Sequence, residues 1–215
     1  HDIRVTDLFE EIAENHHEQD HADPIGCSVI AVSNGDGIGD IFRSLGATRV
    51  VNGGQSMNPS TADLLEAVEA IASEHVIILP NNSNIVAVAE QVDSQTSKTI
   101  RVVETHTVTE GFASLLGYDP EGTSDKNQTD MTQFSQMVES GEITTAVRES
   151  ASDVGQIKKG DFLGLRKGKV TVIAETIVEA TRNLLKEMIS DDHEIITLVA
   201  GRDSNKKETD EVVAW

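Results

Sequence analysis

The stretch Gly53-Gly54-Gln55-Ser56-Met57-Asn58-Pro59-Ser60 follows the short apolar run 50–52 and leads into a helical pattern. A second polar turn, Pro80-Asn81-Asn82-Ser83-Asn84, follows the apolar run 76–79 in the same way. If these runs are neighbouring parallel strands, both turns lie at the carboxyl edge of one sheet, where α/β proteins bind ligands. The turns are rich in amides and hydroxyls and almost free of charge. This composition favours a polar binding rim over a set of acid–base catalysts.

Outward from these turns, four strand–helix units follow one another along the chain. The expected strands are residues 28–33, 50–52, 76–79 and 100–103, and the expected helices are residues 37–45, 60–71, 85–92 and 107–116. Ser60 with Asp63, and Thr107 with Glu110, have the spacing of capping boxes at helix starts. Such an alternation predicts an α/β lobe built on a doubly wound parallel sheet.

After Tyr118 the pattern becomes α+β. The expected elements are a loop at 119–128, a helix at 131–138, a strand at 143–148, two strands around 166–169 with a bulge at Gly164, a helix capped by Thr176 and Glu179, a strand at 194–199 and a helix from 209. We therefore expect three parts: a helical lead-in and polar tether at 1–24, the parallel-sheet lobe at 25–120 and a smaller α+β lobe at 121–215.

Composition narrows the class of protein. The formal net charge of −20 over 215 residues would repel a polyanion, which argues against nucleic acid as a partner and favours a basic one. No apolar run is long enough to cross a membrane. The single cysteine, Cys27, excludes an internal disulfide and a cysteine-rich zinc site, and it fits a reducing cytoplasm. The chain opens on His1 rather than methionine, which predicts a piece of a longer protein. Its oligomeric state stays open.

Several catalytic motifs match in part. His17-Glu18-Gln19-Asp20-His21 has the letters of a zinc-protease helix, but its polar surroundings offer no apolar face, and we interpret it as a chance match. Residues 35–40, Gly-Asp-Gly-Ile-Gly-Asp, place aspartate where a dinucleotide fingerprint needs glycine, so a glycine turn at the sheet edge is the favoured interpretation. We assign no metal ligand and no catalytic residue.

The candidate ligand- or partner-binding residues lie after the four expected strands. They are Asn34, Gly35, Gly54, Gln55, Ser56, Asn58, Asn81, Asn82 and His106. A structural role as turn and capping residues is the alternative for the whole set.

Specific runs within these segments carry a family resemblance. GGQSMNPST at 53–61, VIILPNN at 76–82 and VVETHTVTEG at 102–111 resemble the carboxy-terminal domain of the large subunit of bacterial fatty acid kinases, a dihydroxyacetone-kinase-like family also labelled DAK phosphatase. TAVR at 145–148 and IKKGDFLGL at 157–165 fit the same pattern. The resemblance extends from residue 28 to residue 201.

The resemblance implies a two-lobed, DegV-like domain in bacterial lipid metabolism. It implies a non-catalytic role: recognising or positioning an acyl-loaded DegV-type fatty-acid-binding protein, while an ATP- and Mg-binding kinase domain outside this chain transfers phosphate. No cofactor is expected in this chain, which should be inactive alone. One alternative is a DegV-like module that binds a fatty acid itself, although Gln55-Ser56 replaces the carriers' Thr-Ser pair. A third hypothesis is a phosphatase-like enzyme acting through His106 and Cys27.

Overall fold

The computed structural model describes residues 26–54, 57–191, 193–201 and 204–215. The described residues form two compact units, the first ending at Val138 and the second beginning at Glu139. The helical lead-in and tether expected at 1–24 lie outside the described residues.

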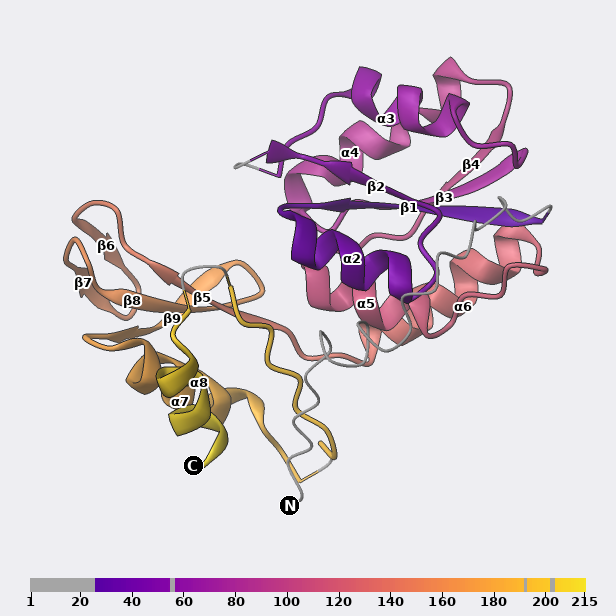
Figure 1. The fold of residues 1–215 in the computed structure, drawn as a ribbon. Coiled ribbons are helices and arrows are strands. Elements are labelled where there is room, and N and C mark those ends of the chain that lie inside the picture. The colour runs from indigo at the N-terminus through magenta and orange to yellow at the C-terminus, as the bar shows by residue number, and fades with distance from the viewer. Residues whose placement is uncertain (1–25, 55–56, 192, 202–203) are drawn as a thin grey trace. The chain divides into compact units, whose positions relative to one another are not determined.

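The first unit is built on a four-stranded parallel sheet with the order β2-β1-β3-β4. Its strands are β1 (Cys27–Ser33), β2 (Arg49–Asn52), β3 (His75–Leu79) and β4 (Thr99–Val102). Its helices are α2 (Asp36–Ser44), α3 (Thr61–Glu69), α4 (Ser83–Glu90), the short 3-10 turn η2 (Asp93–Gln95), α5 (Val108–Leu115) and α6 (Ser124–Gln136). Helices α3 and α4 cover one face of the sheet and α2, α5 and α6 the other (Figure 1). The doubly wound α/β fold expected from the sequence is confirmed.

Burial along β1 explains why this sheet is the centre of the unit. All seven of its residues are buried, as expected for a strand with neighbours on both sides and helices on both faces. Ile30 and Val32 enter the core under α3 and α4, whereas Val29 and Ala31 enter the core under α2 and α5. Because successive side chains of a strand point to opposite faces of the sheet, this one run of residues contributes to both hydrophobic layers.

The helix starts follow the capping chemistry of the sequence. Ser60 and Asp63 form a complete capping box at α3, each side chain bonding to the other residue's backbone. Thr107 caps α5 by accepting from the Glu110 amide, but the Glu110 carboxylate accepts from the amide of His106, one residue before the cap. In the second predicted capping box, the carboxylate therefore bonds to the residue before the N-cap and not to the N-cap itself.

The second unit holds an antiparallel sheet of order β5-β8-β9 and a separate hairpin, β6-β7. The strands are β5 (Gly141–Thr145), β6 (Ser150–Ser152), β7 (Gly155–Ile157), β8 (Phe162–Arg166) and β9 (Lys169–Ala174), and the helices are α7 (Ile177–Met188) and α8 (Lys206–Val213). The bulge expected at Gly164 is present between Gly164 and Leu165. A Cβ at Gly164 would lie 2.9 Å from the Val172 Cβ, so this bulge also needs the absence of a side chain.

The first unit ends later than the boundary expected at residue 120, because α6 belongs to it. This helix begins at Ser124, inside the stretch predicted as a loop. Asn127 donates to the Asp119 carbonyl in the preceding loop, and Gln128 Nε2 donates to the Val102 carbonyl of β4 at 2.8 Å, so the second bond ties α6 to the parallel sheet. The polar residues that suggested a loop are therefore the contacts that hold a helix in place.

Two further elements differ from the prediction in the second unit. The β6-β7 hairpin was not predicted, because its strands have only three residues each and little apolar content. Residues 194–199, predicted as a strand, belong to no strand of the structure.

Candidate functional site

The carboxyl ends of all four parallel strands lie at one edge of the sheet, as the sequence predicted. The strands β2 and β3 that precede the two polar turns are not neighbours, however, because β1 lies between them. In the register of the sheet, Ser33 at the end of β1 pairs with Asn52 at the end of β2, and Leu79 of β3 pairs with Ala31. The loops that follow β1, β2, β3 and β4 therefore emerge together. We call this edge, formed by the described residues 34–35, 53–54, 57–58, 80–82 and 103–107, the polar rim.

A buried asparagine joins three of the strands at the polar rim. The Asn81 side-chain Nδ2 donates to the Val32 carbonyl at the end of β1 at 2.8 Å, and its Oδ1 accepts from the Thr105 hydroxyl beyond β4 at 2.8 Å. The Thr105 hydroxyl also accepts from the Asn81 backbone amide at 3.0 Å. Asn81 is 2% exposed and Thr105 is fully buried. These bonds use both ends of the Asn81 amide, so in this structure the side chain stabilises the rim.

Asn82 and the glycine turn connect the remaining loops. Asn82 caps α4 by accepting from the Asn84 amide, and its Nδ2 donates to the Met57 carbonyl at 3.1 Å. Gly54 has φ +66°, a value that glycine adopts freely, and its amide donates to the Asn52 side chain at 2.9 Å. The loops after β2 and β3 are thereby hydrogen-bonded to each other.

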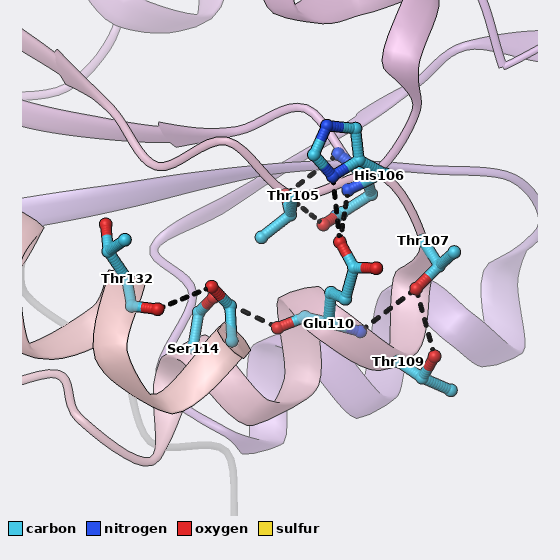
Figure 2. Close-up of polar contacts among 9 residues, drawn as sticks. Thr105, His106, Thr107, Thr109, Glu110, Ser114 and Thr132 are labelled. Atoms are coloured by element: carbon cyan, nitrogen blue, oxygen red, sulfur yellow. Dashed lines mark hydrogen bonds and ion pairs between the residues drawn. The ribbon is translucent and has the colours of Figure 1, made fainter. Parts of the chain in front are cut away.

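His106 is held by its neighbour on α5. Its backbone amide donates to the Glu110 carboxylate at 2.6 Å, and its Nδ1 lies 3.2 Å from the same Oε2 atom (Figure 2). The His106 side chain is about half exposed, with a relative accessibility of 49%. The imidazole is therefore fixed at the rim while part of it still faces solvent.

Asn34, Gly35 and Asn58 are the outward-facing candidates, since all three are exposed. No hydrogen bond joins the Asn34 or Asn58 side chain to another residue that the structure describes. Gly35 has φ +83° and precedes α2 without a capping side chain. The other two candidates, Gln55 and Ser56, lie outside the described residues. The described candidates therefore include side chains that form hydrogen bonds within the rim and side chains that are exposed to solvent.

Sequence reasoning missed Thr105, the second half of the Asn81 junction. The signal was available in its spacing: Asn81 lies two residues after the end of β3, and Thr105 lies three residues after the end of β4. Two polar residues at similar distances beyond adjacent parallel strands are placed to meet.

Comparison with known proteins identifies the domain. The family model of the FakA-like fatty acid kinase C-terminal domain matches residues 28–215. The chain belongs to this family. It is also 39% identical to the protein YloV of Bacillus subtilis over 187 residues, which is 87% of this chain and 34% of YloV. An uncharacterized protein of Staphylococcus haemolyticus is 38% identical over 203 residues, covering 94% of this chain and 37% of that protein. The chain thus spans about a third of the length of these relatives.

The glycine motif at 35–40 forms the turn into α2 and its first residues in this FakA-like C-terminal domain. Gly39 is buried in α2, and a Cβ there would lie 3.5 Å from the Val50 Cγ1 atom of β2. Asp40 pairs with Arg43 one turn later at 2.7 Å. The 3.5 Å distance at Gly39 is ordinary van der Waals contact, so a side chain would fit at position 39. Gly35, with φ +83°, is the position where glycine is favoured, in agreement with the glycine-turn interpretation.

The structure separates the two residues of the phosphatase hypothesis. Cys27 opens β1 and is level with His75, which is level in turn with Thr99 at the start of β4. His106 lies beyond the other end of β4. Because the strands are parallel, the thiol and the imidazole occupy opposite edges of the sheet and cannot act on one substrate atom.

The Cys27 thiol is expected to be unreactive toward alkylation in the folded domain. It is fully buried, and burial raises the pKa of its thiol to about 11. At pH 8 the folded protein should react with iodoacetamide at least about 100-fold more slowly than the protein unfolded in urea, because the reactive thiolate is scarce and shielded. Comparable alkylation rates with and without urea would contradict this prediction.

The same pKa predicts how Cys27 affects stability at high pH. Since the folded pKa lies above the ordinary value, the contribution of the neutral thiol to the free energy of unfolding should be full below pH 9 and should be lost as the pH rises through 11.

No cluster of three or more His, Cys, Asp or Glu side chains with the geometry to hold a metal ion occurs among the residues that the structure describes. Within the same residues, no helix has the length and apolar character needed to span a membrane. The His17–His21 motif lies outside the described residues.

Proposed function

We propose that this domain recognises an acyl-loaded, DegV-type fatty-acid-binding protein and positions it for phosphorylation by the ATP-binding part of a longer fatty acid kinase chain. Membership of the FakA-like fatty acid kinase C-terminal family carries this proposal. In it, the domain supplies a docking surface, and the phosphate transfer with its ATP and Mg takes place elsewhere in the longer chain. A place in bacterial lipid metabolism and in the cytoplasm is part of the same proposal.

The polar rim supports a docking role because hydrogen bonds already connect its loops in the absence of a partner. Asn81 joins three strands, Asn82 joins two loops, and Glu110 fixes His106. A rim held in this way loses little conformational entropy when a partner binds, which favours affinity. Asn34 and Asn58 add exposed amides that can donate and accept hydrogen bonds on the outer side of the rim.

Calorimetric titration with a DegV-type carrier tests the proposal directly. We expect the 215-residue chain to bind the acyl-loaded carrier with micromolar or tighter affinity, a free energy of about −8 kcal/mol or better. The empty carrier provides the comparison that shows whether the acyl group contributes. The chain alone, given ATP and fatty acid, should form no acyl-phosphate. Absence of heat with both carrier forms would overturn the docking role, and formation of acyl-phosphate would overturn the non-catalytic assignment.

Arginine substitutions on the rim should locate the docking surface. The variants Asn34→Arg and Asn58→Arg each place a long cation on an exposed rim position, and we expect each to weaken carrier binding about 10-fold or more by steric mismatch. Ser97→Arg is the matched control, because this residue precedes β4 at the opposite edge of the sheet. Its affinity should stay within about 2-fold of the parent. Equal weakening by all three variants would indicate a non-specific charge effect and place docking elsewhere.

A further inference from the structure

Helix α2 begins at the polar rim without a capping side chain. Its N-cap is Gly35, whose φ of +83° and ψ of 154° define a backbone conformation that essentially only glycine adopts. The first helical bond runs from the Gly39 amide to the Gly35 carbonyl at 3.2 Å. The amides of residues 36–38 lie before that bond and donate to no acceptor among the described residues. Backbone donors of this kind attract anions.

The hydroxyl of Ser33 is a second, independent donor without a partner. Ser33 ends β1 and is only 1% exposed, yet its side chain forms no hydrogen bond with any residue that the structure describes. Its backbone carbonyl is already used, because it accepts from the Gly53 amide at 3.0 Å. Buried hydroxyls in native proteins nearly always have a hydrogen-bond partner. A bound group that accepts from Ser33 would supply the missing one.

The register of the sheet places Ser33 beside the first turn of α2. Side chains alternate along β1, so Ser33 shares the face of Ala31, which packs in the core under α2. Ala31 is level with Val50, and a Cβ at Gly39 of α2 would lie 3.5 Å from the Val50 Cγ1 atom. Helix α2 therefore passes over the sheet at this level.

From that level, both segments lead to the polar rim. Ser33 lies two residues beyond Ala31, about 7 Å further along the strand. Helix α2 runs back from the end of β1 towards the start of β2, so its first residue lies nearer the rim than Gly39 does (Figure 1). Asp36 lies three residues before Gly39, about 4.5 Å along the helix axis. The Ser33 hydroxyl and the amides of residues 36–38 are thus at one edge of the sheet and on one face.

The approach to these donors is open and carries one opposing charge. A Cβ at Gly35 would have no atom within 4 Å, so the turn leaves room for a ligand on that side. Asp40 pairs with Arg43 at 2.7 Å. Asp36 is the acidic residue of the first turn, and it is exposed. A ligand anion would therefore be attracted by the helix start and repelled by the Asp36 carboxylate.

We propose that the first turn of α2 and the Ser33 hydroxyl together bind a phosphate group. The three amides of residues 36–38 and the hydroxyl supply four donors, and a phosphate presents three strongly accepting oxygens to them. A carboxylate presents only two oxygens. Asp36 and the net charge of −20 oppose binding, so we expect a dissociation constant of about 1 mM. This site needs no carrier protein and is independent of the docking role proposed above.

Titration of the 215-residue chain with inorganic phosphate tests the site when the amide resonances are followed by nuclear magnetic resonance. At constant ionic strength, the amides of residues 36–38 should shift and saturate with a dissociation constant of about 1 mM. The amides at the start of α3, which Ser60 caps, are the internal control and should not shift. Acetate should bind at least about 5-fold more weakly. No saturable shift at residues 36–38, or equal binding of acetate, would overturn the phosphate site.

Three substitutions separate ligand binding from a structural role. Ser33→Ala should weaken phosphate binding at least about 5-fold. It should leave the urea midpoint unchanged, because the hydroxyl has no protein partner to lose. Asp36→Asn removes the opposing charge and should tighten binding about 3-fold or more. Glu74→Gln is the charge control, because Glu74 is exposed and precedes β3 at the opposite edge of the sheet, and its affinity should stay within about 2-fold of the parent.

Two outcomes would contradict this assignment. A lower urea midpoint for Ser33→Ala would show that the hydroxyl has a structural role, and an unchanged phosphate affinity in Ser33→Ala and Asp36→Asn would place the anion elsewhere. Either result together with normal carrier binding would remove the phosphate site and leave the docking role intact.

Discussion

Replacing Asn81 with alanine is expected to lower the free energy of unfolding of the first unit by about 4 kcal/mol. The change removes the bonds to the Val32 carbonyl and from the Thr105 hydroxyl, and losing a buried hydrogen-bond partner costs about 1–3 kcal/mol for each group. The Thr105 hydroxyl keeps only its bond from the backbone amide of residue 81. Asn81 also has φ +54°, a left-handed conformation that costs alanine about 1 kcal/mol or more. Since a whole domain is stable by about 5–15 kcal/mol, this loss should be conspicuous in urea denaturation followed by circular dichroism.

Asn58→Ala is the matched control for this experiment, because Asn58 is an exposed asparagine of the same rim. It should change the free energy of unfolding by no more than about 0.5 kcal/mol. Equal stabilities of the two variants would mean that the Asn81 bonds contribute little and would return Asn81 to the set of residues available for a ligand.

Replacing Gly111 with alanine is expected to destabilise the same unit by about 2 kcal/mol, the opposite of its usual effect in a helix. Alanine normally stabilises a helix interior by about 1 kcal/mol relative to glycine. Here a Cβ would overlap the Asn81 Oδ1 atom, so α5 or the asparagine must move. Overpacking of this kind typically costs about 1–3 kcal/mol.

The double variant provides the sharpest comparison for Gly111. In an Asn81→Ala background the obstructing amide is gone, and Gly111→Ala should become neutral or stabilising. The two substitutions should therefore be non-additive by about 2–3 kcal/mol in a double-mutant cycle followed by urea denaturation. Additive losses would show that Gly111 is constrained by something other than Asn81.

These expectations change how the polar rim is understood. The candidates were chosen by residue type and by position after a strand, and the structure does place the described ones at one edge. It divides them, however, into Asn81 and Asn82, whose amides hold the rim together, and Asn34 and Asn58, which face outward. Type and position are visible in a sequence, but the direction of a side chain depends on which backbone groups neighbouring loops leave unpaired.

The second unit also shows that a local sequence pattern does not determine contacts between distant segments. Helix α7 was predictable because its apolar face and Thr176 cap are local signals. Residues 194–199 carried an equally clear local signal, yet they belong to no strand, because pairing depends on a partner that is distant in sequence. The position of α6 in the first unit likewise rests on Asn127 and Gln128 bonds that no local pattern predicts.

The amino-acid sequence alone was enough to predict the alternation of strands and helices, the doubly wound parallel sheet, the helix caps at Ser60, Thr107 and Thr176, and the edge where polar loops converge. These features follow from periodicity and from hydrogen bonds between residues three or four apart, which a single chain segment can specify.

Contacts between distant segments settled the rest: Asn81 meets Thr105, α6 closes the first unit, and Cys27 and His106 lie at opposite edges. Those outcomes depend on strand register and on the pairing of buried polar groups between segments far apart in sequence. Leaving a buried amide or hydroxyl without a partner costs more free energy than a local conformational preference contributes. The folded structure, and not the local pattern, therefore decides where each of these groups forms its hydrogen bond.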